Sequence, residues 1–300
     1  MKKIVAVFLT LSVLTSALWL GYKKYEHYLH NPWTRDGQVR SQVIQITPRV
    51  TGMVTAIHIR DNQFVHKGDL LFEIDPSTYK LKVKQAEARL KRAIEASRGY
   101  KTEYERLKSI YAKDKGAVSQ KDMIRSEVNY FKSLADIENA QESLNTARLN
   151  LKFTKVTAPV DGWVSNINFQ TGSQATANQP LMALVDKQSF WIFGFFREDM
   201  IKDVHEGDEA VVTLMAYPGK PLHGRVESIA WGIAPRDGNP GKNLLPSIQP
   251  VFQWIRLAQR IPVRIKLDKP LPKGVILRVG MSATVLVKKD SSHQPHPAKP

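Results

Sequence analysis

The feature that most constrains the fold is a long helical pattern in the middle of the chain. Across residues 83–111, apolar and small side chains recur in alternating steps of three and four. A polar stretch at 113–116 ends this run, and a second helical pattern extends over 123–151. Two long helices joined by a short polar turn predict an antiparallel helical hairpin, placed at residues 77–153. Because its seam is rich in Ala, Ser and Tyr, we expect neighbouring subunits to complete its packing, in a homo-oligomer.

Two short β patterns on either side of the hairpin resemble each other. Residues 50–54 match residues 160–164 at an offset of 110, and residues 70–75 match residues 181–186 at an offset of 111. Each half contains a Gly, a short strand, a turn, and a second apolar strand that ends in Asp. A chance likeness between short β segments is the alternative to an internal repeat.

The repeat predicts one small β-sandwich that the hairpin interrupts. Its halves are residues 47–76 and 154–187. Gly52 and Gly162 are expected at equivalent turns, and Gly68 belongs to a later turn of the first half.

The C-terminal third has the alternation of half-buried strands. Apolar and polar residues alternate at 261–268 and again at 281–287. The alternation predicts β structure in this third of the chain.

The N-terminus carries the one long apolar run. Residues 4–22 contain no charge and have lysines on both flanks, and at about 1.5 Å per residue they span roughly 28 Å. This predicts a transmembrane anchor at residues 1–24, with the bulk of the chain translocated. A cleaved signal peptide is the alternative, because residues 15–17 are small. The next apolar run, residues 190–196, is short and predicts a buried strand.

The chain is strongly basic, with a formal net charge of +16. Such a charge suits nucleic acid, an anionic membrane surface or simple solubility. The basic residues of the first predicted helix fall at nearly every position outside the seam, which favours a solvated helix face over a nucleic-acid site. We therefore expect no nucleic-acid partner.

Motifs for catalysis and cofactors are missing from the sequence. The absence of cysteine excludes thiol catalysis, thiolate metal sites and disulfides. No Walker loop, paired-His motif, nucleophile elbow or dinucleotide fingerprint is present. Residues 291–300 are expected to form a flexible tail, in which His293 and His296 are only a weak alternative for metal binding. We predict no enzymatic activity, no catalytic residue, no cofactor and no metal.

Several of these segments resemble the membrane fusion proteins, the haemolysin-secretion-D-like periplasmic adaptors of bacterial efflux and secretion systems. The turn at 65–70 with the following Ile-Asp-Pro at 74–76 is similar to the first half of their lipoyl domain, and residues 157–162 are similar to the start of its second half. Residues 31–37 and 256–264 are similar to the subgroup that serves aromatic carboxylic acid (p-hydroxybenzoic acid) efflux pumps.

The resemblance implies a mixed α and β, elongated fold. It would have an N-terminal transmembrane helix, a split lipoyl-like β-sandwich interrupted by a coiled-coil hairpin, and a small β-barrel. The resemblance implies that the β-barrel and membrane-proximal region cover residues 188–290. It also implies that residues 25–46 supply a linker and a first barrel strand, with the strand at 39–46. It also implies a periplasmic adaptor, held in the inner membrane by a single pass. Such an adaptor links an inner-membrane transporter to an outer-membrane exit duct of the TolC type and exports small molecules, with aromatic carboxylic acids as one candidate class.

Other functions remain open at this point. One is an adaptor for a major-facilitator-type multidrug exporter, and a more remote one is a membrane-anchored coiled-coil scaffold without a transport role. An acyl or biotinyl carrier is a further class, but the hairpin interrupts the turn that would hold its modifiable lysine.

The resemblance also implies that the hairpin tip contacts the duct. In the family the tip carries an Arg, an aliphatic residue four positions on and a Ser at the start of the second helix; Arg106, Ile110 and Ser119 match these positions. Ala117 and Val118 join them as candidate contacts. Ser119 can alternatively, or also, cap the second helix.

A long Pro- and Gly-rich connection at residues 232–250 is the second candidate contact. Loops of this length are usually functional or disordered. Its apolar members and a following Trp favour contact with the transporter or the bilayer surface, and a loop packed on its own barrel is the alternative. The candidate contact residues are Leu244, Leu245, Ile248 and Trp254.

Overall fold

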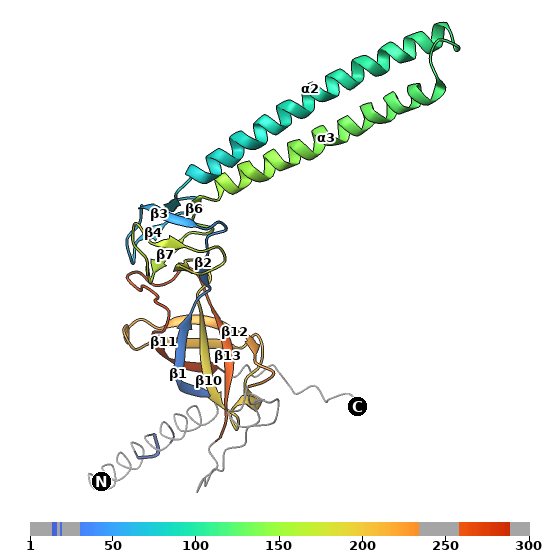
Figure 1. Ribbon diagram of the computed structural model, residues 1–300. Helices are drawn as coiled ribbons and strands as arrows, with labels where there is room; N and C mark the ends of the chain where they lie inside the picture. Colours follow the sequence, from blue (N-terminus) through green and yellow to red (C-terminus); the bar gives the residue numbers. More distant parts are fainter. Residues whose placement is uncertain (1–13, 17–18, 20–30, 234–257, 289–300) are drawn as a thin grey trace, which may run out of the picture. The chain divides into compact units, whose positions relative to one another are not determined.

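The computed structural model describes residues 14–16, 19, 31–233 and 258–288. They fall into two compact units, each described by itself below. The sandwich–hairpin unit comprises residues 43–187, and the barrel unit comprises the described residues before and after it (Figure 1).

The barrel unit is a closed antiparallel barrel in which the strands follow the order β1-β10-β13-β12-β11-β14. Its strands are β1 (Trp33–Arg40), β10 (Trp191–Arg197), β11 (Glu209–Leu214), β12 (Leu222–Ile229), β13 (Arg260–Leu267) and β14 (Ser282–Lys288). Alternate residues point inward, as the sequence alternation predicts: Val263 and Ile265 of β13 and Val285 of β14 are fully buried. The short apolar run is indeed a strand, β10, with Ile192 and Phe196 in the core.

The sandwich consists of two four-stranded sheets. One has the order β2-β9-β7-β4 and the other β6-β5-β3-β8, so each sheet combines strands from before and after the hairpin. The strands are β2 (Val43–Ile46), β3 (Gly52–Ile57), β4 (Phe64–Val65), β5 (Leu70–Ile74), β6 (Lys155–Thr157), β7 (Gly162–Ser165), β8 (Gln174–Ala175) and β9 (Met182–Asp186). Their apolar faces form one core around Leu71, Phe72 and Leu184.

The register of the sandwich shows the internal repeat directly. Gly52 pairs with Ala175, and at the equivalent place Gly162 pairs with Val65. The two glycines are not in turns, which corrects the expectation, because they are the first residues of β3 and β7. A Cβ on Gly162 would lie 2.2 Å from Val185 O, so close packing requires glycine there. Gly68 does lie in a turn, with φ of +95°.

The single barrel strand expected at 39–46 is two strands in different units. β1 ends at Arg40 in the barrel, whereas β2 begins at Val43 and pairs with β9 of the sandwich. Between them the Oγ atoms of Ser41 and Ser189 lie 2.8 Å apart. Residues 40–42 are Arg, Ser and Gln, so the apolar pattern is interrupted at this break, and the polar stretch marks the boundary between the two strands.

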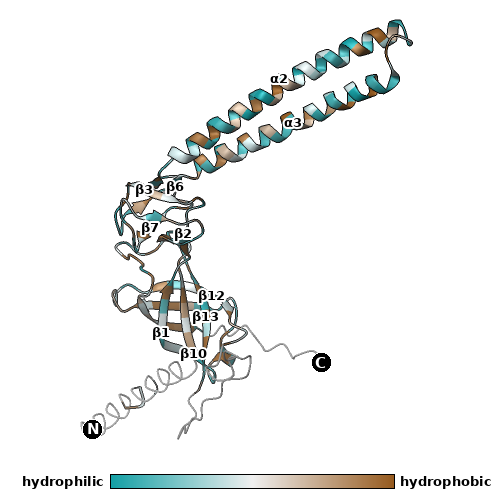
Figure 2. Ribbon diagram, viewed as in Figure 1, coloured by the Kyte–Doolittle hydropathy of each residue, from teal (hydrophilic) through white to brown (hydrophobic). Residues whose placement is uncertain are grey.

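The hairpin consists of α2 (Ser77–Lys113) and α3 (Gln120–Lys152), of 37 and 33 residues. At 1.5 Å per residue the shorter helix is about 50 Å long. The seam buries mostly small side chains: Ala86, Ser97, Ser126, Ser133 and Leu144. Figure 2 shows hydrophilic and apolar residues interspersed along both helices.

Several predicted segments lie outside the described residues. The anchor at residues 1–24 is described only at 14–16 and 19, and the tail at 291–300 is not described. Leu244, Leu245, Ile248 and Trp254 also lie outside. Within the described part of the chain, no helix combines the length and the apolar composition that crossing a membrane requires.

Candidate functional site: the hairpin tip

The turn between the two helices is organised by its own backbone and side-chain contacts. Asp114 caps α2, and its backbone N–H donates to Ile110 O at 2.9 Å. The Asp114 carboxylate accepts from the Gly116 N–H at 2.8 Å, and the Ala117 N–H donates to Asp114 O at 3.2 Å. An aspartate that bonds to the backbone two residues on is a common turn device. The tip therefore has a defined conformation.

Ser119 caps the second helix. Its backbone is extended and its Oγ accepts from the Lys121 N–H at 3.3 Å. Asp122 lies in the first turn of α3, where a negative charge interacts favourably with the helix dipole. This confirms the capping interpretation of Ser119, and the exposed side chain stays accessible to a partner.

Three of the predicted contact residues line one open hollow. Ala117 and Ser119 are exposed, and Val118 is half-buried. The hollow has a volume of about 500 Å³ and is lined from both helices and the turn. Its lining residues are Glu103, Leu107, Ala117, Val118, Ser119, Asp122, Arg125, Ser126 and Asn129. Val118 thus contributes an apolar wall to a hollow whose lining also contains side chains of negative and positive charge.

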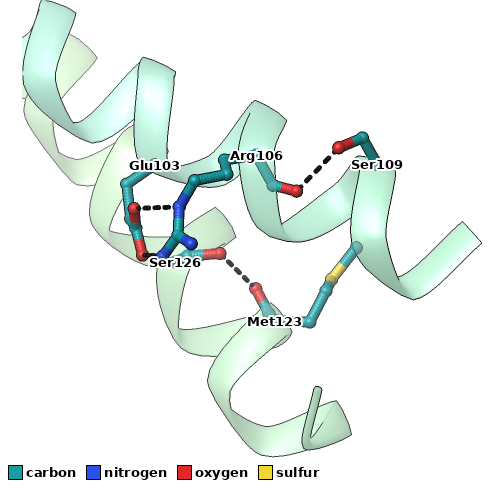
Figure 3. Close-up of polar contacts among 5 residues, drawn as sticks. All are labelled: Glu103, Arg106, Ser109, Met123 and Ser126. Carbon is teal, nitrogen blue, oxygen red and sulfur yellow. Dashed lines mark hydrogen bonds and ion pairs between the residues drawn. The ribbon is translucent and has the colours of Figure 1, made fainter. Parts of the chain in front are cut away.

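Arg106 lies on α2 and pairs with its own helix. Its Nη2 donates to Glu103 Oε1 at 2.8 Å and its Nε donates to Glu103 Oε2 at 3.0 Å (Figure 3). Hydrogen bonding to Arg106 lowers the pKa of Glu103, and the same contact raises the pKa of Arg106. Next to this pair, Ser109 and Ser126 donate to backbone carbonyls of their own helices.

The structure brings together only part of the predicted tip set. Arg106 and half-buried Ile110 are not among the described residues that line the hollow. The lining instead includes Glu103, Leu107 and Arg125, which sequence reasoning missed. The seam position of Leu107 in the heptad pattern was the available signal, because seam residues face the opposite helix and those nearest the turn lie between the two helix ends.

Outside the tip, two observations bear on function. Trp231 is fully exposed just before the segment that is not described. No group of three or more His, Asp or Glu residues is arranged for metal binding among the described residues.

Comparisons with known proteins match the two units separately. Residues 42–187 match the family described as RND MFP, barrel-sandwich hybrid domain, and residues 189–288 match the AAEA-like beta-barrel domain. The uncharacterized protein YdhJ of Escherichia coli (strain K12) is 34% identical over 285 residues, which cover 95% of this chain and 98% of that protein.

Solved structures share the fold. MacA from Actinobacillus actinomycetemcomitans is 21% identical with a TM-score of 0.64, over 85% of this chain and 81% of that one. The membrane fusion protein Spr0693 from Streptococcus pneumoniae R6 is 17% identical with a TM-score of 0.61, over 86% of this chain and 99% of that one.

A hairpin inserted into a barrel-sandwich hybrid, with a separate β-barrel, defines a class of non-enzymatic periplasmic adaptors of efflux pumps. The chain belongs to this class, the membrane fusion protein family, which bridges inner-membrane transporters and outer-membrane channels. The resemblance to the membrane fusion protein family is therefore confirmed at the level of the family, together with the prediction that the chain is not an enzyme.

Proposed function

We propose that this chain is the adaptor subunit of a tripartite efflux pump. It links an inner-membrane transporter to an outer-membrane exit duct of the TolC type and serves the export of small molecules, aromatic carboxylic acids among them. The observation that carries the proposal is the hairpin tip, an ordered turn at the end of two long helices with an apolar residue in an open hollow. Energy comes from the transporter, because the sequence has no nucleotide-binding motif.

The tip residues are the proposed contacts with the duct. Val118 gives the hollow an apolar wall, and exposed Ala117 and Ser119 lie at its rim. An apolar side chain at a solvated tip gains stability when a partner covers it. Arg106 and Ile110 are secondary contacts. To bind the duct, the Arg106 guanidinium must either break its ion pair with Glu103 or use a donor that this pair leaves free.

The experiment that tests the proposal changes the tip without changing the helices. Val118→Asp should abolish export while expression and membrane attachment remain. Because Val118 is half-buried, Ala117→Asp provides a second variant at an exposed site, and it should impair export with no change in thermal stability. Ala96→Asp, on an exposed face of α2 remote from the tip, is the matched control and should export normally. Normal export by both tip variants would contradict tip docking.

Lateral packing of hairpins is proposed for a homo-oligomer. Ile124, Val128 and Phe131 are 49%, 58% and 57% exposed and follow the spacing i, i+4, i+7 on α3. They therefore form one apolar stripe, which a neighbouring copy would cover. Cysteine crosslinking at Val128 should yield dimers and higher species in membranes, whereas a monomeric pattern would contradict the packing.

The inner-membrane attachment is proposed from the uncharged run at residues 4–22. Protease added to spheroplasts should digest everything beyond about residue 24, while a tag on the N-terminus stays protected or is left on a small fragment. Protection of the C-terminal bulk would contradict this topology.

The proposed transporter contacts are Leu244, Leu245, Ile248 and Trp254. Their support is the composition of the connection and the full exposure of Trp231 immediately before it. Crosslinkers at Asn243 and Gln249 should capture the transporter in an active pump. Capture of a major-facilitator exporter would favour the multidrug alternative for the substrate, and failure to co-purify with any transporter would favour the scaffold.

A further inference from the structure

A second cavity lies at the base of the hairpin, inside the sandwich–hairpin unit. Its volume is about 390 Å³, within the range of small-ligand sites. It is lined by Ile44, Gln45, Ile46, Thr47, Arg49, Lys152, Phe153, Lys155, Val156, Thr157 and Pro159. β2 and β6 are edge strands of the two sheets, so the cavity lies between two strand edges that have no neighbour within the described residues.

The internal repeat relates the two strand edges that border this cavity. Ile46 and Val156 occupy equivalent positions of the two halves, as do Thr47 and Thr157, at the offset of 110 residues. The two equivalent edges thus present similar apolar and hydroxyl groups. The halves differ at the pair Gln45 and Lys155, where the second half places a cation.

The cavity is cationic. Arg49, Lys152 and Lys155 are all exposed at its rim, and its described lining contains no carboxylate. None of the three forms an ion pair with any described residue, whereas Arg148 higher on α3 pairs with Glu87 at 3.0 Å. The C-terminus of α3 carries a partial negative charge of about half a unit, which three cations outweigh.

Arg49 is held in position by an aromatic ring. Its Cζ lies over the Phe153 ring at 4.8 Å from the centroid. This contact with the ring uses none of the guanidinium N–H donors in a hydrogen bond, and a guanidinium can bind a carboxylate through two such donors. Beside it, buried Ile46 and half-buried Ile44 and Val156 supply an apolar wall.

We propose that this cavity binds a small aromatic carboxylate. The carboxylate would pair with Arg49 and a rim lysine, and the flat apolar body would lie against the isoleucine and valine side chains. An extended peptide added to a strand edge is the competing occupant. It is disfavoured because β2 has only four residues and β6 only three, and because backbone pairing does not require a cationic rim.

The proposal deepens the proposed function and rests on it for its biological meaning, since an adaptor with this site would contact the exported molecule. Binding is tested separately on the purified full-length chain. Titration with 2-naphthoate should show saturable binding to one site, and the neutral 2-naphthamide should bind about tenfold more weakly. Arg49→Gln should weaken naphthoate binding by about the same factor. Lys91 is an exposed lysine of α2 that does not line the cavity, so Lys91→Gln should leave binding unchanged.

Equal affinity for acid and amide, equal affinity of the two variants, or no binding would overturn the proposal. Those results leave the efflux function standing if the wild-type chain still supports export. Conversely, naphthoate binding that depends on Arg49, in a chain whose tip variants all export normally, would support the cavity and contradict tip docking.

Discussion

The side-chain oxygens of Ser97 and Ser133 lie 2.9 Å apart between α2 and α3, and both residues are buried. Ser133 Oγ is also 2.6 Å from Tyr130 O. Such small residues let the two helices approach closely at the middle of the hairpin. On either side the seam contains larger side chains: Leu144 toward the base, and the stacked rings of Tyr104 and Tyr130 toward the tip.

Replacing Ser133 tests this close approach. Ser133→Leu should destabilise the hairpin by about 1–3 kcal/mol, because a larger side chain forces the helices apart. The double variant Ser97→Ala, Ser133→Ala should stay within about 1 kcal/mol of the wild type, since it removes both polar partners together. Urea unfolding followed by circular dichroism at 222 nm measures both. A Leu variant as stable as the wild type would show that the seam is loosely packed.

Two glycines should respond to alanine in opposite ways. Gly99 lies within α2 with open space around it, so Gly99→Ala should stabilise the helix by about 0.5–1 kcal/mol. Gly162→Ala should destabilise the sandwich by about 1–3 kcal/mol or more, because its Cβ meets the backbone of Val185. Thermal unfolding of the two single variants compares them, and a stabilising Gly162→Ala would refute the close packing of β7 on β9.

The Glu103–Arg106 pair gives a pH-dependent signal. The pKa of Glu103 is lowered from 4.5 by the hydrogen bonds from Arg106, so the pair's stabilising effect is present above about pH 4.5 and is lost as the pH falls through the lowered value. In Arg106→Gln the Glu103 carboxyl should titrate at higher pH, measured by ¹³C NMR. Lys108→Gln is the control. It also removes a positive charge from α2, but Lys108 forms no hydrogen bond or ion pair with Glu103 among the described residues. Identical titration in wild type and Arg106→Gln would contradict the pairing.

The sequence predicted the hairpin and the split sandwich because both rest on periodicity. A heptad seam without Pro spans each helix, and the two halves repeat the order Gly, strand, turn, strand. Because these patterns depend on residues close together in the sequence, the helices of the hairpin lie where the pattern predicts them. The match of Gly52 to Gly162 even predicted which positions would be equivalent in the register.

Other features depended on contacts that no local pattern encodes. Glycine in β3 and β7 is required by a neighbouring strand, Val185 O in the case of Gly162, and not by a turn conformation. By contrast, the spacing i, i+3 of Glu103 and Arg106 is a local pattern that predicts their pairing on one helix. The cationic cavity joins residues over one hundred positions apart, Arg49 and Lys155, and was not foreseen.

The last prediction is that the sandwich folds without its hairpin. The two ends of the hairpin are tied together by the sandwich itself, because the Ile74 N–H donates to Thr154 O at 2.8 Å and β5 pairs with β6. A short Gly-rich linker in place of residues 78–152 therefore closes only a small loop, and loop closure of this kind costs little.

The deletion also removes Tyr79, whose hydroxyl donates to Thr51 O at 2.7 Å and whose ring packs on the sandwich core, so a loss of about 1–3 kcal/mol is expected. The product should unfold cooperatively, lose most of its helical dichroism, show dispersed proton NMR signals and fail to support export. Gly162→Ala in the same shortened chain is the matched control and should abolish the cooperative transition or lower its midpoint. A shortened chain without a cooperative transition would show that the hairpin is needed to hold the two halves in one sandwich.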